Sequence, residues 1–490
     1  MSLMKLKSGT DIRGTAVGEN IELTDDAVRK IAFAFISYLC ERENIAKDDI
    51  VLAVGHDSRI SAQRIKNALL SVFAAEGIRV YDCGLASTPA MFMTTVTLGV
   101  TASVQITASH HPYDKNGLKF FTKDGGFEGE DIKAVLERAD KLSEVSTAQS
   151  DAETIDFMSR YSEILKNKII DGINDGDRPL EGFRLVVDSG NGAGGFFERL
   201  LSDLGADTSG SQFSEPDGMF PNHIPNPEDK TAMRFITEAV IRNGADLGII
   251  FDTDVDRAAC VASDGKEINR NALIALSSVI ALENSAGGTI VTDSVTSSGL
   301  REFINCHLGA KHYRYKRGYK NVINKAIELN RQGMNCPLAI ETSGHAALRE
   351  NYFLDDGAYL MVKIIILMAK MRKEGKTVET LLEPLKMPYA EKEVRYIIEE
   401  EDFRAYGETV IRDFERYCEQ FPLIIPCDDN REGFRVNFNK WCGDGWLLVR
   451  LSVHDPVIPV NMESDSEGGI ERIEMFWNGF IKNYEKLRKK

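Results

Sequence analysis

The chain has 490 residues, of which 43% are hydrophobic and 27% charged, enough for about three or four globular domains. Its formal net charge of -16 argues against nucleic acid or an anionic membrane surface as the main partner, because both require a basic surface. Eight cysteines occur without a Cys-x-x-Cys pair, which is typical of reduced thiols. The first residues lack the apolar stretch of a signal peptide, and no apolar run is long enough to span a bilayer. We therefore expect a cytoplasmic protein with no membrane partner.

The first 153 residues predict an α/β domain. Its pattern is helix 25–40, strand 49–55, helix 61–75 and strand 78–82, which is typical of a parallel βαβ unit. A strand at 104–106 leads into Thr107-Ala108-Ser109-His110-His111-Pro112, and Asn116-Gly117 predicts a tight turn before a strand at 118–121. A helix is expected over 130–142, followed by a polar linker up to Glu153.

Two loops of this domain carry side chains suited to chemistry. Ser109 is presented at a strand-to-loop edge beside two histidines, where Pro112 prevents a helix from starting. Arg13 lies in a turn bracketed by glycines, and its guanidinium could bind phosphate in a bidentate manner. Each pattern taken alone also fits an ordinary polar surface loop.

Residues 154–267 predict a second α/β domain with a candidate metal site. A helix is expected from 155 to 173 and a buried strand at 183–188, followed by a glycine-rich turn at 189–195. This turn lacks the G-x-G-x-x-G order, so we expect its glycines to allow close packing. The strand at 245–251 runs into Asp252, Asp254 and Asp256, which alternate along extended chain and share one face. Three carboxylates at the carboxyl end of a strand favour Mg²⁺ binding.

Residues 268–387 and 388–490 predict a third α/β domain and a C-terminal α+β domain. A strand at 337–340 ends in Glu341-Thr342-Ser343-Gly344-His345, and Asp355-Asp356 begins a helix. The basic cluster Arg314-Tyr315-Lys316-Arg317 is expected to be a solvated face. In the last domain, strands at 434–438 and 446–450 precede the loop Arg450–Pro456. A closing helix is expected from about Ile470 to Leu487.

The combination of a serine loop and a carboxylate triplet indicates a reaction class. A serine beside histidine could mean acyl transfer, but the G-x-S-x-G elbow is missing. Three carboxylates that bind Mg²⁺ favour phosphoryl transfer instead, because metal and cations neutralise the moving group.

These motifs resemble those of the α-D-phosphohexomutases, the phosphoglucomutases and phosphomannomutases, over nearly the whole chain. Thr107–Pro112 is similar to the phosphoserine loop of the family, Asp252–Arg257 to its metal loop, Glu341–His345 to its sugar-recognition loop, and Arg450–Pro456 stands at its phosphate-binding loop. Ser8–Gly14 and Phe220–Pro227 also look familial. The resemblance implies four domains around a central cleft, three doubly wound α/β domains with mixed sheets plus a C-terminal α+β domain. The expected domains are 1–153, 154–267, 268–387 and 388–490.

The resemblance also implies a mechanism. Phosphorylated Ser109 would donate its phosphoryl group to a hexose monophosphate, and the second phosphate of the resulting hexose 1,6-bisphosphate would return to Ser109. That bisphosphate would also act as activator, on an enzyme that is a monomer or a homodimer. The residues fall into three expected groups: Ser109, Lys119, Arg13, His110 and Arg257 in catalysis; Asp252, Asp254, Asp256 and the Ser109 phosphate around Mg²⁺; and Glu341, Ser343, His345, Arg450, Ser452 and His454 in substrate binding.

The sequence departs from the family pattern at four positions. His111 stands where asparagine is common, Ile340 replaces a glycine, and Val453 and His454 alter the phosphate-binding loop. Valine does not favour the positive φ that glycine or asparagine allows. Our hypothesis is that His454 supplies the lost donor and makes phosphate affinity pH-sensitive near neutrality.

Three alternatives remain open from the sequence. The substrate could be glucosamine phosphate or N-acetylglucosamine phosphate, although Glu341 and Ser343 favour glucose or mannose. Phe251–Val255 also resembles the haloacid-dehalogenase phosphatase signature, with Asp252 as nucleophile. A non-catalytic sugar-phosphate binding protein is the third alternative, which the altered last loop supports.

Overall fold

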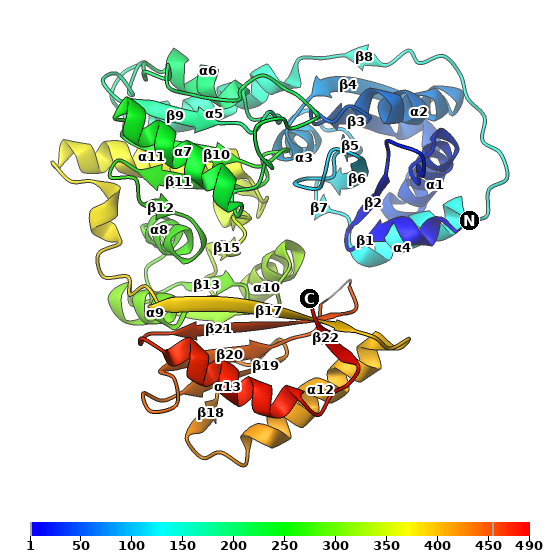
Figure 1. Cartoon of the computed structure of the whole chain (residues 1–490). Helices are drawn as coiled ribbons and strands as arrows, with labels where there is room; N and C mark the ends of the chain where they lie inside the picture. Colours follow the sequence, from blue (N-terminus) through cyan, green and yellow to red (C-terminus); the bar gives the residue numbers. More distant parts are fainter. Residues whose placement is uncertain (1, 453–454) are drawn as a thin grey trace. The chain divides into compact units, whose positions relative to one another are not determined.

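The computed structural model describes residues 2–452 and 455–490, which form two compact units (Figure 1). Unit 1 contains the chain up to Leu273 together with Ser343–Glu379, and unit 2 contains Ile274–Thr342 and Thr380–Lys490. Two mixed sheets with helices lie in unit 1, while unit 2 holds a parallel set of strands and an antiparallel sheet. The predicted fold class, α/β with a C-terminal α+β domain, is confirmed.

The first sheet of unit 1 is mixed and follows the order β1-β2-β6-β5-β3-β4-β8, with β7 paired to β6. β3 pairs in parallel with β4 and β5, as the βαβ pattern predicted, and β6 runs antiparallel to β5 and β2. The strands are β1 (Lys7–Ser8), β2 (Asp11–Thr15), β3 (Val51–His56), β4 (Arg79–Leu85), β5 (Ala102–Ile106), β6 (Lys115–Thr122), β7 (Gly125–Gly126) and β8 (Glu153–Thr154).

Helices cover both faces of this sheet. α1, α2 and α4 share one core with strand residues such as Val54 and Val104, whereas α3 contacts β3, β5 and β6 on the opposite face. Thr24 caps α1, because its hydroxyl accepts a hydrogen bond from Ala27 N, and Asn44 ends the helix in the left-handed conformation. The helical elements are η1 (Leu3–Leu6), α1 (Asp25–Glu43), η2 (Lys47–Asp49), α2 (Ala62–Ala75), α3 (Thr88–Thr97) and α4 (Gly129–Ala139).

The predicted tight turn at Asn116-Gly117 is wrong, because both residues lie inside β6. Gly117 is needed for close packing instead. A Cβ there would lie 2.3 Å from Ile12 O and 2.7 Å from Thr107 O. The chain reverses earlier, between Ile106 at the end of β5 and the start of β6, which is where Ser109 lies.

The second sheet of unit 1 has the order β12-β11-β10-β9, with β9 parallel to β10 and the other neighbours antiparallel. α7 packs on one face of this sheet, and α11 contacts β10, β11 and α5. The elements are α5 (Phe157–Ile173), β9 (Leu185–Asp188), α6 (Phe196–Asp203), α7 (Lys230–Asn243), β10 (Leu247–Phe251), β11 (Ala258–Ala262), β12 (Glu267–Ile268), β16 (Ala346–Leu348), η4 (Arg349–Asn351) and α11 (Gly357–Lys373).

Unit 2 contains the parallel strands β14-β13-β15 and an antiparallel sheet with the order β18-β19-β20-β21-β17-β22. Its α/β part has β13 (Thr289–Thr292), α9 (Ser298–Glu302), η3 (Phe303–His307), β14 (Lys311–Arg314), α10 (Tyr319–Arg331) and β15 (Leu338–Ile340). Its C-terminal part has β17 (Ala390–Ile398), α12 (Phe403–Cys418), β18 (Ile424–Pro426), β19 (Phe434–Phe438), β20 (Gly445–Val449), β21 (Val457–Ser464), α13 (Gly469–Ile481) and β22 (Leu487–Lys489). α8 (Arg270–Leu282) and η5 (Val378–Leu381) each contain a boundary between the units.

Two sequence predictions for unit 2 are wrong. The closing helix ends at Ile481, and Leu487–Lys489 form an edge strand because their backbone pairs with Tyr396–Ile398 of β17. Arg314 does not belong to a solvated face. It is buried and forms an ion pair with Asp429 at 2.8 Å.

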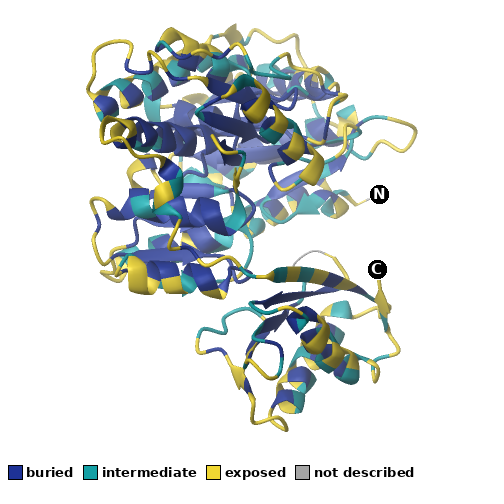
Figure 2. Cartoon of the chain, turned by 60° about the vertical axis from the view of Figure 1, so that its left-hand side comes forward, coloured by how far each residue is buried: buried dark blue, intermediate teal, exposed yellow. Residues whose placement is uncertain are grey.

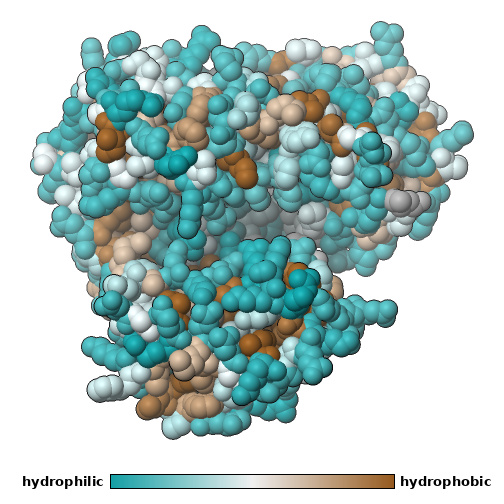
Figure 3. Space-filling view, in the orientation of Figure 1, coloured by the Kyte–Doolittle hydropathy of each residue, from teal (hydrophilic) through white to brown (hydrophobic). Residues whose placement is uncertain are grey.

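Burial follows the sheets, as Figure 2 shows by the dark blue strands and the yellow loops and outer helix surfaces. The face of the molecule seen in Figure 3 is largely hydrophilic, with hydrophobic residues in small scattered groups. Among the described helices, none combines the length and the apolar character that a membrane crossing needs.

Candidate active site

Ser109 lies in the connection between β5 and β6, which we call the Ser109 loop (residues 107–114). Its φ is 52°, a left-handed conformation that is uncommon for residues other than glycine. Ser109 N donates to Thr107 Oγ1 at 2.9 Å, and Thr107 Oγ1 donates to Asp57 Oδ2 at 2.7 Å. The serine is thus buried and held in an unusual backbone conformation by side chains on two strand ends.

The Ser109 hydroxyl faces the residues predicted as the metal loop. Ser109 Oγ donates to Asp252 Oδ2 at 3.0 Å and accepts from Arg257 Nη2 at 3.2 Å. His110 Nδ1 lies 3.3 Å from the same oxygen. Burial, together with the charge of Arg257, lowers the pKa of His110 to about 2, so this imidazole is neutral. Arg257 therefore supplies the positive charge in contact with the serine oxygen.

Asp252, Asp254 and Asp256 lie in the hairpin loop between β10 and β11, and their side chains are fully buried. Val255 N donates to Asp252 O at 3.3 Å and Val255 has a φ of 67°, so the aspartates lie in a turn and not along the extended chain that the sequence predicted. The hairpin is packed tightly, since a Cβ at Gly192 would lie 2.5 Å from Thr253 O. This supports the predicted packing role of the glycine-rich turn.

The three carboxylates fit a hard divalent cation. One oxygen from each lies within 4.8 Å of the others, and within the described part of the chain Asp254 Oδ1 and Asp256 Oδ1 are buried without a hydrogen-bond partner. Burial and the charge of Asp256 raise the pKa of Asp252 well above its usual range, so the cluster needs positive charge. Oxygen donors of this kind suit Mg²⁺.

Lys119 supplies part of that positive charge. It projects from β6, and its Nζ donates to Asp254 Oδ2 at 3.0 Å and to Asp256 Oδ2 at 2.5 Å. Burial acts to raise the pKa of Asp256, but the charges of Lys119, His345 and Arg257 bring it below its usual range. The predicted acid/base residue thus lies among the predicted metal ligands.

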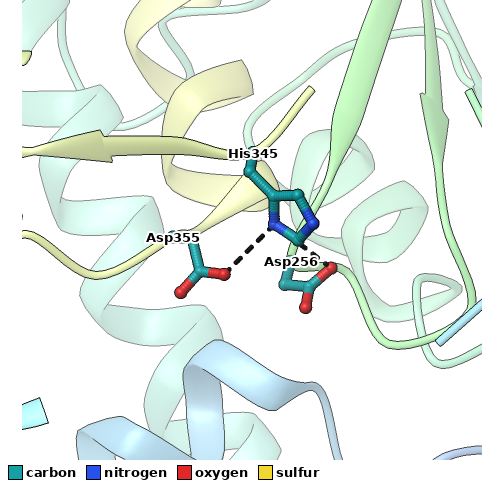
Figure 4. A group of neighbouring side chains, drawn as sticks. All are labelled: Asp256, His345 and Asp355. Carbon is teal, nitrogen blue, oxygen red and sulfur yellow. Dashed lines mark hydrogen bonds and ion pairs between the residues drawn. The ribbon is translucent and has the colours of Figure 1, made fainter. Parts of the chain in front are cut away.

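A histidine between two aspartates adjoins this cluster (Figure 4). His345 Nδ1 lies 3.1 Å from Asp355 Oδ2 and 3.9 Å from Asp256 Oδ1. Although burial alone would lower it, the pKa of His345 is raised by the charge of Asp256 and the hydrogen bond to Asp355. His345 Nδ1 thus faces the carboxylates of Asp355 and Asp256.

Comparison with known proteins identifies the relatives of this chain. The family models of phosphoglucomutase/phosphomannomutase α/β/α domains I, II and III match residues 4–146, 159–265 and 269–388, respectively. The chain belongs to the phosphoglucomutase/phosphomannomutase family. It is therefore an enzyme of the isomerase class, a phosphohexomutase in which phosphoryl transfer accomplishes the isomerisation.

Individual relatives span nearly the full chain. A Thermococcus kodakarensis protein named phosphoglucomutase/phosphomannomutase is 30% identical over 469 residues, covering 94% of this chain and 95% of the relative. A Cupriavidus pinatubonensis protein named phosphoglucosamine mutase is 31% identical over 480 residues, covering 95% and 96%. The crystal structure of a phosphoglucomutase/phosphomannomutase family protein from Burkholderia thailandensis matches with a TM-score of 0.80 and 25% identity, covering 99% of this chain and 98% of that one.

The remaining predicted residues of this phosphohexomutase lie in several places. Arg13 in β2 forms an ion pair with Asp11 at 2.7 Å, and its charge contributes to lowering the pKa of His110. Ser343 and His345 belong to unit 1, whereas Glu341, Arg450 and Ser452 belong to unit 2. His454 and Val453 lie outside the described residues, so the hypothesis about them stays a prediction.

Unit 2 carries a second group of buried polar residues. Glu341 Oε1 accepts a hydrogen bond from Gly318 N at 2.6 Å, and Arg450 is buried at the end of β20. Burial lowers the pKa of Arg450, against the charges of Glu432 and Glu393, which raise it. Charged groups of both signs therefore surround the residue that stands at the expected phosphate-binding loop.

Sequence reasoning missed several residues that hold this machinery in place. Thr88 at the start of α3 donates to Asp254 Oδ2 at 2.5 Å, and Asp355 contacts His345. Asp57 and Arg59 follow β3, so the rule that functional groups gather at the carboxyl ends of strands could have found them. In unit 2, Asp293 Oδ2 accepts a hydrogen bond from Thr342 Oγ1 at 2.6 Å.

Proposed function

We propose that this phosphohexomutase interconverts hexose 1-phosphate and hexose 6-phosphate, with glucose and mannose as the hexoses and Ser109 as the phosphoryl carrier. The observation that carries the proposal is the position of Ser109 Oγ, 3.0 Å from Asp252 Oδ2 and 3.2 Å from Arg257 Nη2. A buried serine beside carboxylates that can bind a metal ion and beside a guanidinium is suited to carry a dianionic phosphoryl group.

Two transfers make up the proposed reaction. In the first, Lys119 acts as a neutral amine, because Mg²⁺ would replace its charge on Asp254 and Asp256, and it takes the proton of a free hydroxyl of the hexose phosphate. A P–O bond forms to that oxygen while the P–O bond to Ser109 breaks, and Ser109 Oγ leaves as an alkoxide beside Arg257. In the second, the other phosphoryl group of the hexose 1,6-bisphosphate passes to Ser109 Oγ. The freed sugar oxygen takes a proton back from Lys119. No co-reactant is consumed, and the enzyme regains its phosphorylated form.

The charges for this reaction come from the chain and from a divalent ion. Asp252, Asp254 and Asp256 would hold Mg²⁺ together with an oxygen of the Ser109 phosphate, and the ion would neutralise part of the phosphoryl charge. Arg257 contacts Ser109 Oγ directly, and Arg13 adds positive charge beside His110. His110 is neutral and can share a hydrogen bond with the serine oxygen.

Substrate recognition belongs to the remaining predicted residues. We infer that Glu341, Ser343 and His345 bind sugar hydroxyls, and that Arg450, Ser452 and His454 bind the phosphate that is not being transferred. The proposal also includes the division into domains 1–153, 154–267, 268–387 and 388–490, and hexose 1,6-bisphosphate as activator. Family membership favours this mutase over the phosphatase in which Asp252 is the nucleophile.

Phosphoglucosamine mutase is a second candidate function, because the relative with that name is 31% identical over nearly the full chain. Comparing kcat/KM on glucose, mannose, glucosamine and N-acetylglucosamine 1-phosphates, with the matching bisphosphate as activator, separates the two. We expect glucose or mannose phosphate to be preferred. A preference for glucosamine phosphate would establish the second candidate.

Mass spectrometry tests the carrier. After incubation with glucose 1,6-bisphosphate, the protein should gain one phosphoryl group, and peptide analysis should locate it on Ser109. Ser109→Ala should lose activity by about 10³-fold or more. The control is Ser103→Ala, which removes a buried hydroxyl of β5 that donates to Met91 O. A phosphoryl group trapped on Asp252 would instead support the phosphatase.

A further inference from the structure

One buried guanidinium holds the main chain of the Ser109 loop. Arg59 follows β3 and is 2% exposed. Its Nη1 donates to Pro112 O at 2.6 Å and to Lys115 O at 2.9 Å, and its Nη2 donates to His111 O at 2.6 Å and to Ser109 O. Four carbonyl oxygens within seven residues of chain thus point to one side chain.

Asp57 completes this arrangement from the other side of Ser109. Its carboxylate lies 3.2 Å from Arg59 Nε and accepts a hydrogen bond from Thr107 Oγ1, which in turn accepts from Ser109 N. The nitrogen of Ser109 is therefore linked to Asp57 through Thr107, and its carbonyl is linked to Arg59. Both ends of the residue with a φ of 52° are fixed by the same ion pair.

A loop from the second half of unit 1 covers this ion pair. The ring of Phe220 lies 5.2 Å from the guanidinium carbon of Arg59. Gly218 allows the loop to approach, since a Cβ there would lie 2.4 Å from Ser58 O and 2.5 Å from Ile60 N. Asn226 in the same loop accepts a hydrogen bond from Arg257 Nη1 at 3.2 Å.

Loop 217–227 therefore contacts both arginines that hold Ser109. Arg59 holds its main chain, and Arg257 Nη2 contacts its hydroxyl at 3.2 Å. This gives a role to the segment Phe220–Pro227, which the sequence singles out without assigning it a function. Phe220 itself has a φ of 49°, so the loop keeps its shape at some conformational cost.

We propose that Arg59 is a positioning residue that fixes the left-handed conformation of Ser109 for phosphoryl transfer, and that loop 217–227 braces Arg59 in place. The inference rests on the proposed role of Ser109 as carrier. Arg59 acts through the backbone of Ser109, because its four terminal N–H contacts are made with carbonyl oxygens. Lysine cannot replace it, since one ammonium group does not match the planar fork that reaches four acceptors.

The rate at which glucose 1,6-bisphosphate phosphorylates Ser109, followed by intact mass, tests the proposal. We expect Arg59→Lys to slow this step by about 10²-fold, the effect of a misplaced nucleophile, with little change in KM for hexose phosphate. Arg59→Ala should be slowed further and partly rescued by millimolar guanidinium, which can occupy the vacated site. Phe220→Leu, which leaves Arg59 intact, should slow the step by about three- to ten-fold.

Arg64→Lys is the matched control. Arg64 also donates to main-chain carbonyls, those of Ala16 and Leu23, and to the carboxylate of Asp25, and these three partners lie outside the Ser109 loop. It should keep the wild-type phosphorylation rate. If wild-type protein is phosphorylated on Ser109 and the folded Arg59 and Phe220 variants react at the same rate, the inference is overturned while the proposed function stands. If Ser109 of the wild type takes up no phosphate, the proposed function fails and the inference fails with it.

Discussion

Lys119 Nζ lies 2.5 Å from Asp256 Oδ2, and both side chains are buried. It joins β6 of the first sheet to the hairpin loop between β10 and β11. The same ammonium donates to Asp254 at 3.0 Å, so one lysine partly neutralises two of the three carboxylates that could hold a metal ion. A metal ion bound there would therefore stabilise the same negative cluster as the lysine.

Replacing Lys119 by methionine should change both catalysis and the response to Mg²⁺. We expect kcat to fall by about 10²-fold or more, because the proposed general acid/base is lost. In EDTA the unfolding free energy should fall by about 3–5 kcal/mol, because two buried carboxylates lose a shared cationic partner. Mg²⁺ should then stabilise the variant more than it stabilises the wild type, as measured by chemical denaturation with and without the ion.

Lys66→Met is the control for this experiment. Lys66 is also buried and pairs with a carboxylate, Asp82, at 2.9 Å, on a different part of the same unit. It should lose stability but keep the wild-type kcat and the wild-type stabilisation by Mg²⁺. An unchanged Mg²⁺ response in Lys119→Met would show that lysine and metal do not share the cluster.

Thr88 should affect metal affinity without touching the metal. Its hydroxyl donates to Asp254 Oδ2 at 2.5 Å, and its backbone N donates to Asp254 O at 2.8 Å. Thr88→Val keeps the shape and removes only the hydroxyl contact, at a cost of about 1–3 kcal/mol in unfolding free energy. The Mg²⁺ concentration for half-maximal activity should rise by about tenfold or more, as for other groups that orient a metal ligand.

Thr94→Val in the same helix provides the comparison. Thr94 is buried, and its hydroxyl donates to Met91 O at 2.6 Å within α3. We expect a similar small loss of stability and an unchanged Mg²⁺ requirement. Equal shifts in the Mg²⁺ requirement of both variants would mean that Thr88 acts only through the stability of α3.

The site residues that the sequence predicted lie in local motifs, whereas a missed residue such as Thr88 is linked to the site only by a long-range contact. Ser109 lies in the loop after β5 and the three aspartates lie in the loop after β10, so each motif begins where a buried strand ends. Thr88 and Asp254 are 166 residues apart, so no short-range pattern links them. The same limit explains the wrong prediction at Asn116-Gly117. The local sequence favours a turn, but both residues belong to β6, where Gly117 packs closely against the backbone of Ile12 and Thr107.

Fold prediction succeeded where burial repeats with a regular period. The strands and helices of the first βαβ unit lie within a few residues of their expected bounds, because each combines an apolar pattern with an end signal. The C-terminal strand β22 was missed, since Leu487–Lys489 has one partly buried apolar residue and gains its structure only from pairing with β17. Arg314 was misjudged because its partner, Asp429, is distant in sequence.

Arg450 should contribute to substrate binding more than to the chemical step. It is buried at the end of β20, in unit 2, among the charges of Glu432, Arg317 and Glu393. Lysine would keep the charge but lose the bidentate fork that suits phosphate. We expect Arg450→Lys to raise KM for hexose phosphate by about 10- to 100-fold, with a smaller change in kcat.

Steady-state kinetics at saturating activator measure this effect. The exposed Arg488, which pairs with Glu399 at 2.7 Å in the same unit, gives a control in Arg488→Lys with wild-type constants. A fall in kcat at unchanged KM in Arg450→Lys would show that this arginine stabilises the transition state specifically, and does not bind substrate and transition state equally well.

A buried pair between strand β9 and the loop 217–227 of unit 1 should make stability depend on pH. His223 Nε2 lies 3.0 Å from Asp188 Oδ1, and His223 Nδ1 lies 2.9 Å from Ile224 O, so both ring nitrogens face acceptors. Burial acts to lower the pKa of His223, but the hydrogen bond and charge of Asp188, with a further contribution from Asp229, leave it raised. The imidazolium is thus favoured in the folded state.

A raised pKa fixes the direction of the pH effect. The contribution of the charged His223 to the unfolding free energy is fully present below the pKa of an unfolded histidine, about 6.5. It is lost as the pH rises through the pKa of His223 in the folded protein. His223→Gln cannot titrate, so its deficit in unfolding free energy, about 3 kcal/mol at pH 6, should shrink steadily above pH 6.5. Urea denaturation of both proteins at a series of pH values measures this difference. Asp188→Asn should likewise weaken the dependence of the unfolding free energy on pH. If the deficit of His223→Gln instead grew with pH, His223 would be neutral in the folded protein.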